Sequence, residues 1–128
     1  MGNEPRNRVR AGRAWRVKRP AEVRRVFDRG RRAADRRLTL LAAPRAAGGD
    51  TRTRLAVAVS KRHGNAVRRN RIKRIWREAF RHVRHELPEG FDYVLIPRVG
   101  SEPPAEELRN SIRNLARRAA AGQEGGEG

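Results

Sequence analysis

The sequence contains no cysteine and few acidic residues. Without cysteine, neither a disulfide framework nor a thiolate metal site can form. No apolar run approaches the roughly 20 residues that a helix needs to cross a bilayer, and the basic N-terminal stretch lacks the apolar core of a secretory signal. We therefore expect a cytoplasmic protein.

The scarcity of acids leaves a large positive charge unbalanced. Of 128 residues, 32 are Lys or Arg and 14 are Asp or Glu, so the formal net charge is +18. A compact protein with this charge repels itself, and a polyanionic partner relieves that repulsion. All cations but Lys18, Lys61 and Lys73 are Arg, whose planar guanidinium grips phosphate through two hydrogen bonds. The composition favours a nucleic acid, with an anionic membrane surface as the alternative.

The length favours one domain with polar ends. Residues 1–14 are basic and lack a hydrophobic period, so they predict a disordered arm. Residues 120–128 are rich in Gly and Glu and predict a disordered tail. Residues 15–119 hold every regular hydrophobic pattern in the chain, so we expect a single domain there.

Hydrophobic spacing predicts three helices in this domain. Pro20 suits the first turn of a helix over residues 20–30, which Gly30 ends. Apolar residues recur at helical spacing over residues 72–87, and Pro88 stops the pattern. Residues 108–119 form a last amphipathic helix, preceded by two prolines.

Three segments predict strands. Residues 38–43 are a short apolar run, and residues 55–60 alternate between larger and small side chains. A loop with Pro44 and two glycines joins them, so we expect these strands to form an antiparallel hairpin. Residues 91–97 are more uniformly apolar and predict the most central strand. The order α-β-β-α-β-α indicates an α+β fold, in which helices pack on a small sheet.

The basic residues gather around the longest helix. Residues 52–85 contain twelve Lys or Arg and a single acid, Glu78. At 100° per residue, one face of this helix is apolar and the opposite face is basic. The side chains on the basic face are Asn70, Lys73, Arg74, Arg77, Arg81 and Arg84. A solvated helix face normally mixes both signs of charge, so this face favours contact with nucleic acid.

Arg68, Arg69 and Arg71 lie at the start of the same helix, where the macrodipole disfavours cations by a few tenths of a kcal/mol each. Free backbone N–H groups at a helix start already attract anions. A phosphate would relieve this conflict. The preceding residues 60–65 add polar donors and a flexible glycine, so we expect this turn to belong to the same site.

Residues 59–80, VSKRHGNAVRRNRIKRIWREAF, closely resemble the signature of the bacterial ribonuclease P protein component. The centre of the signature is Arg69-Asn70-Arg71, followed by Ile72-Lys73-Arg74. The resemblance extends over about residues 17–119. It implies an α/β sandwich with a left-handed β-α-β crossover, a handedness that runs against the usual rule. It also implies a four-stranded mixed sheet, with the fourth strand near residues 31–37.

The resemblance also implies a function. Members of this family are the non-catalytic protein subunit of a ribozyme endonuclease, which removes the 5′ leader from precursor tRNA with Mg²⁺ bound mainly by the RNA. The implied partners are the catalytic RNA subunit and precursor tRNA, rather than DNA or a membrane. The residues that match the RNA-subunit site are Lys61, Arg62, Asn65, Arg68, Arg69, Asn70, Arg71, Lys73, Arg74 and Arg77.

A cleft between the first helix and the sheet holds the single-stranded leader in this family. The matching positions here are Val23, Phe27, Leu38 and Leu41, of which only Phe27 is aromatic. Stacking on an aromatic ring contributes about 1–3 kcal/mol per base, so an aliphatic cleft should grip bases less. Two roles are open for Phe27: contact with the leader, or packing in the hydrophobic core.

Two further functions are open to the residues themselves. His63, His82 and His85 are the only histidines, and the last two share a helix side with Glu78, a spacing that could hold a metal for a self-sufficient nuclease. The sequence shows no acidic cluster for two metals and no nucleophile with a base, so we predict no catalytic site and no metal site. A basic ribosomal or chromatin-type binder is the second alternative. A preference of the protein for structured RNA over duplex DNA would distinguish these functions.

Overall fold

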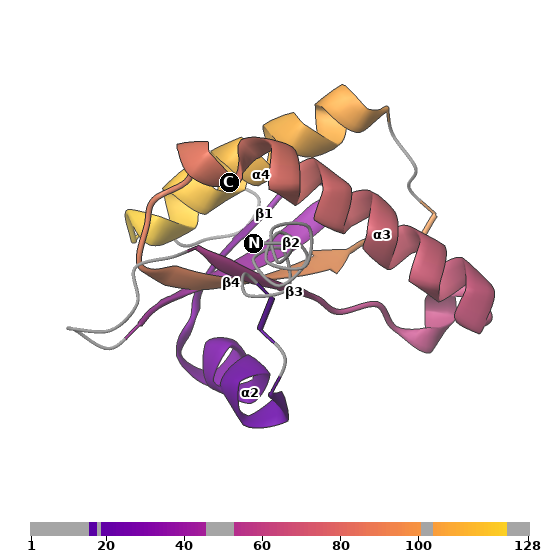
Figure 1. The fold of residues 1–128 in the computed structure, drawn as a ribbon, viewed down its shortest axis with the longest axis horizontal. Helices are drawn as coiled ribbons and strands as arrows, with labels where there is room; N and C mark the ends of the chain where they lie inside the picture. Colours follow the sequence, from indigo (N-terminus) through magenta and orange to yellow (C-terminus); the bar gives the residue numbers. More distant parts are fainter. Residues whose placement is uncertain (1–15, 18, 46–52, 101–103, 123–128) are drawn as a thin grey trace, which may run out of the picture.

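The computed structural model describes residues 16–17, 19–45, 53–100 and 104–122. Their main elements are α2 (Pro20–Arg29), β1 (Arg31–Ala34), β2 (Leu38–Pro44), β3 (Arg54–Val57), α3 (Ala66–Val83), β4 (Phe91–Pro97) and α4 (Ala105–Ala120). Two short 3₁₀ turns, η1 (Lys61–His63) and η2 (Arg84–Glu86), flank α3. The sheet forms a middle layer, with α3 and α4 on one face and α2 on the other (Figure 1).

The predicted ends of the chain fall mostly outside this description. The arm over residues 1–14 lies wholly outside the described residues, and so do residues 123–128 of the tail. Ala120, where we expected the tail to begin, is the last residue of α4. In the part of the chain that the structure describes, no helix is long and apolar enough to cross a membrane.

The four strands form one mixed sheet in the order β1-β2-β4-β3. β1 and β2 are antiparallel, β2 and β4 are antiparallel, and β3 and β4 are parallel. The expected fourth strand is thus present at the start of residues 31–37. A parallel neighbour needs a crossover, and α3 supplies it between β3 and β4. The α+β fold class is confirmed.

The predicted hairpin between residues 38–43 and 55–60 is wrong, because β4 lies between β2 and β3. Tyr93, Val94 and Leu95 of β4 are buried on both faces of the sheet. A strand that is apolar on both faces is fully covered only with a neighbour on each side, so it takes an inner position. The strand that forms a hairpin with β2 is instead β1, which precedes it in the chain. Asp35 Oδ1 stabilises the turn between them by accepting hydrogen bonds from the amides of Arg37 and Leu38.

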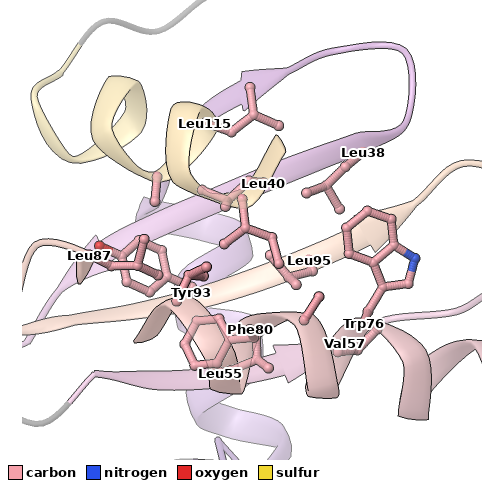
Figure 2. Packing of buried hydrophobic residues seen from close by; sticks show 14 of the residues in the cluster. Leu38, Leu40, Leu55, Val57, Trp76, Phe80, Leu87, Tyr93, Leu95 and Leu115 are labelled. Atoms are coloured by element: carbon pink, nitrogen blue, oxygen red, sulfur yellow. The ribbon is translucent and has the colours of Figure 1, made fainter. Parts of the chain in front are cut away.

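The main core lies between the sheet and the two helices α3 and α4. Trp76 and Phe80 of α3 point toward β4, which carries Leu95 and Tyr93 (Figure 2). The rings of Phe80 and Tyr93 meet edge to face, with centroids 6.3 Å apart. Burial raises the pKa of the Tyr93 phenol, and its hydroxyl donates to the Pro88 carbonyl at 2.9 Å. This face of the sheet is therefore closed by large side chains.

A smaller core joins α2 to the other face. Its buried members are Val26, Leu41, Ala43 and Val94. Gly30 ends α2 as predicted, because a Cβ at this position would lie 2.4 Å from the Val26 carbonyl oxygen. The chain can therefore leave the helix here and enter β1 at once.

Candidate RNA-binding surface

The turn before α3 is shaped by its own side chains. Ser60 Oγ accepts from the amide of Arg62 at 3.3 Å, and Asn65 Oδ1 accepts from the amide of Arg68 at 3.0 Å, which caps α3. Gly64 has a φ of 122°, and a Cβ there would meet the Arg68 side chain at 2.8 Å. Only glycine fits this position without strain. The turn is therefore pre-formed, with Lys61 and Arg62 exposed to solvent.

His63 anchors this turn to the sheet. Its side chain is buried, and its Nε2 atom lies 3.1 Å from the carbonyl oxygen of Pro97, at the end of β4. A carbonyl can only accept, so Nε2 carries the proton in this contact. His63 thus holds Lys61 and Arg62 beside the start of α3.

The first half of α3 presents cations without acids. No Asp or Glu occurs in residues 51–77, and Arg68, Asn70, Arg71 and Arg74 are exposed. Arg69 is half-buried, and its Nε donates to the Gly64 carbonyl at 3.1 Å, so it also supports the turn. Most of the predicted RNA-subunit residues are therefore exposed on η1 and on the first half of α3, whereas Lys73 and Arg77 are half-buried.

The second half of α3 differs. Glu78 lies 2.6 Å from Arg81 and 3.3 Å from His82, and the hydrogen bond from Arg81 lowers the pKa of Glu78. This part of the basic face is thus partly neutralised, as expected for a solvated helix surface. The unbalanced charge is concentrated at the N-terminal end of α3.

Arg16 is a cation of this surface that the sequence pattern did not reveal. It forms a parallel bridge with Leu55 of β3, which brings the segment before α2 back to the sheet. Burial lowers the pKa of Arg77, and the nearby charge of Arg16 lowers it further. The only local signal was the position of Arg16 in a basic segment.

The four predicted leader residues do not lie together. Leu38 belongs to the main core beside α3 and α4, whereas Leu41 belongs to the smaller core beneath α2. The placement of Leu38 in the cleft is wrong, because residues three apart in a strand point to opposite faces of a sheet. Leu41 lies on the face covered by α2 and is almost completely buried.

Val23 and Phe27 do lie together, along one flank of α2. With Pro20, Arg24 and Asp28 they line an open hollow of about 570 Å³. The Phe27 side chain is 47% exposed, so it is not an ordinary core residue. A half-exposed ring beside a hollow can stack on a base.

Comparisons of the sequence with known proteins identify a single family. A family model described as ribonuclease P matches residues 12–120. The ribonuclease P protein components of Brevibacillus brevis and Shouchella clausii are 37% and 39% identical to the chain. The first match covers 84% of both proteins, and the second covers 81% of this chain and 84% of the relative.

Solved structures give the same result. An RNase P protein mutant from Staphylococcus aureus superimposes with a TM-score of 0.73 at 28% identity, over 86% of this chain and 92% of the other. The RNase P protein from Thermotoga maritima gives a TM-score of 0.70 at 29% identity, over 80% and 96%. The chain belongs to the ribonuclease P protein family. The predicted resemblance is confirmed, and the family acts in tRNA processing as the RNA-binding protein of a ribonucleoprotein.

The histidines of this ribonuclease P protein do not gather into one site. His63 is held by β4, whereas His82 lies on α3 about 24 Å along the helix axis from its first residue. Glu78 and His82 form a pair, and in the described ranges no group of three His, Asp or Glu side chains could hold a metal ion.

Proposed function

We propose that this chain is the protein subunit that assists the catalytic RNA of ribonuclease P in removing the 5′ leader from precursor tRNA. It works in the cytoplasm and has no catalytic site of its own. The observation that carries the proposal is the acid-free surface formed by η1 and the first half of α3, where Arg68, Arg71 and Arg74 are exposed beside a capped helix start.

The RNA subunit binds this surface through its phosphates. A guanidinium donates two parallel hydrogen bonds to a phosphate, and the N-terminal end of α3 adds a favourable dipole. The turn is held by Gly64, Asn65 and His63 before RNA arrives. Binding therefore does not have to order this segment, which lowers its entropic cost.

The leader of precursor tRNA passes along the hollow beside α2, where Phe27 supplies one stacking ring. Val23 supplies an aliphatic contact only, so the hollow holds bases less firmly than one with several aromatic rings. Sequence preference for the leader is expected to be weak, because an aromatic ring accepts any base.

Hydrolysis in this proposal depends on Mg²⁺ bound mainly by the RNA. The protein contributes positive charge, which reduces the repulsion between two polyanions, and it positions the leader. Its benefit should be largest at low Mg²⁺ and should shrink as salt rises, since added ions screen the same repulsion.

Replacing exposed Arg71 and Arg74 with alanine tests the proposal. Each lost phosphate contact should reduce the slope of log K against log salt for the RNA subunit by about one unit. Arg117→Ala is the matched control, because Arg117 is exposed on α4 and carries the same charge. If the double variant keeps the wild-type slope, the proposed surface does not bind the RNA subunit.

A further inference from the structure

A second hollow lies between α3 and α4, on the face of the sheet opposite α2 (Figure 1). Its volume is about 380 Å³, which is at the small end of the range for small-molecule sites in proteins, roughly 300–1,000 Å³. The hollow beside Phe27 lies along α2 instead, so the sheet separates the two. A ligand of the second hollow would therefore not compete with the leader.

The floor of this second hollow is apolar and borders the main core. Ile75 and Ala79 lie one turn apart on α3, and Ala105 and Leu108 lie one turn apart on α4. Leu108 and Ala79 are buried, whereas Ile75 is half-buried and Ala105 is exposed. Because two of these four side chains are alanine, the helices leave an apolar surface open between them.

Two arginines from different helices line the same hollow. Arg74 on α3 is exposed, and Arg109 on α4 is half-buried. The Nε atom of Arg109 is buried and has no hydrogen-bond partner among the described residues. A buried donor without an acceptor is unfavourable, and native proteins seldom leave one. The Arg109 guanidinium therefore lacks an acceptor that a ligand of the hollow could supply.

The acidic side chain at this hollow is already compensated. Glu78 and His82 line it further along α3. Glu78 lies 2.6 Å from Arg81 and 3.3 Å from His82. The positive charge that a ligand meets in the hollow therefore comes from Arg74 and Arg109.

These features match the chemistry of one nucleotide in single-stranded RNA. A base has flat apolar faces and carbonyl acceptors on its edge, and its sugar carries a phosphate. Arg74 also belongs to the acid-free surface formed by η1 and the first half of α3, so the hollow continues that surface. Bases within an RNA helix are paired and stacked, so only an unpaired base can enter a hollow of this kind.

We propose that the hollow between α3 and α4 binds one unpaired base of the RNA subunit. The base packs on Ile75 and Leu108, its edge accepts a hydrogen bond from Arg109, and its phosphate meets Arg74. This inference rests on the proposed function and deepens it, because it adds a base contact to a surface that otherwise binds phosphates. Phosphate contacts carry no sequence information. The base contact thereby directs the protein to a particular bulge or loop of its RNA.

Ala105→Leu in the full chain tests the inference, because the longer side chain occupies the hollow without a change in charge. Ala105 is the exposed first residue of α4, so the Tm should not change. Affinity for the RNA subunit should fall roughly tenfold, the equivalent of about 1.4 kcal/mol. The slope of log K against log salt should stay close to that of the wild type, since the cations remain. Ala121→Leu adds the same side chain at the exposed other end of α4 and should bind like the wild type.

Chemical modification of the RNA subunit locates the base. Dimethyl sulfate reports on unpaired adenine and cytosine, and a carbodiimide reports on unpaired guanine and uracil. At least one base should lose reactivity when the wild-type protein binds and regain it with Ala105→Leu. If Ala105→Leu keeps the wild-type affinity and protection pattern, the hollow binds no base of the RNA subunit, and an acidic peptide is its remaining ligand.

Arg109→Lys tests the hydrogen bond, because it keeps the charge but removes the planar guanidinium. Affinity for the RNA subunit should fall by about two- to tenfold, as expected for one lost hydrogen bond. Arg117→Lys, exposed on the same helix, is the matched control and should not weaken binding. Wild-type affinity of Arg109→Lys would overturn the role of Arg109.

Arg71→Ala/Arg74→Ala in the same assays separates this inference from the proposed function, because that variant should flatten the salt slope. A flattened slope there, with wild-type affinity and protection for Ala105→Leu, would overturn only the base site. Wild-type binding by all of these variants would overturn the proposed function as well.

Discussion

The two faces of the sheet differ in how completely they are covered. Trp76 and Phe80 of α3 close one face together with α4, and large side chains there are excluded from solvent. The other face carries only α2, a helix of ten residues whose buried member is Val26. Such a short helix is held by a small apolar contact and by Arg25, which donates to the Pro44 carbonyl and lies 3.7 Å from the buried carboxylate of Asp92 on β4. The closed face stabilises the domain, and the more open face leaves Phe27 half-exposed beside a hollow.

Phe80→Ala should produce the largest loss of stability, because it opens a cavity in the closed face. Phe80 is 0% exposed and packs against Tyr93. The free energy of unfolding should fall by about 3–5 kcal/mol, measured by urea denaturation. If Phe80→Ala lowers the free energy of unfolding less than Leu41→Ala on the α2 face, the two faces do not differ in the way described.

Asp92→Ala should destabilise the protein by about 3 kcal/mol, because it removes the buried carboxylate that accepts two hydrogen bonds from the partly buried Arg54. This loss is at the low end for a buried ion pair, because the Arg54 side chain is 19% exposed and keeps partial access to water. Asp28→Ala is the control: Asp28 is exposed on α2, and its loss should change stability by less than about 0.5 kcal/mol. Equal effects of the two substitutions would mean that α2 is not attached through Asp92.

Phe27→Ala should affect binding more than stability. The half-exposed ring should cost less than about 1 kcal/mol of unfolding free energy on truncation. Discrimination between precursor and mature tRNA should fall by about 1–3 kcal/mol if the ring stacks on a leader base. Thermal melts, measured beside binding to precursor and to mature tRNA, distinguish a leader contact from a core role. A core role would lower Tm strongly and weaken binding to both tRNAs equally.

His82→Ala/His85→Ala should have the smallest effect. Both side chains are exposed on the outer side of the α3 region. Activation of the catalytic RNA at low Mg²⁺ should stay within about twofold of wild type, measured as the rate of precursor cleavage. Cleavage by the protein without RNA, abolished in this variant, would restore the nuclease alternative. His63 is left unchanged because it supports the turn before α3.

Local patterns in the sequence were sufficient to predict the acid-free basic surface of η1 and the first half of α3. The period of apolar residues in α3 determines which side packs, and residues 51–77 contain no acid to balance the opposite side. Ser60, Gly64 and Asn65 act on atoms within a few residues of themselves. Interactions of such short range are readable without knowledge of the rest of the fold.

Tertiary structure alone decided the strand order and the arrangement of the α2 face. The insertion of β4 between β2 and β3 separated segments that are consecutive in sequence, and it placed Asp92 beside Arg54. The pleat of β2 then divided Leu38 from Leu41. Strand pairing of this kind depends on contacts between residues far apart in the chain, and its energy comes from complete burial of the most apolar strand.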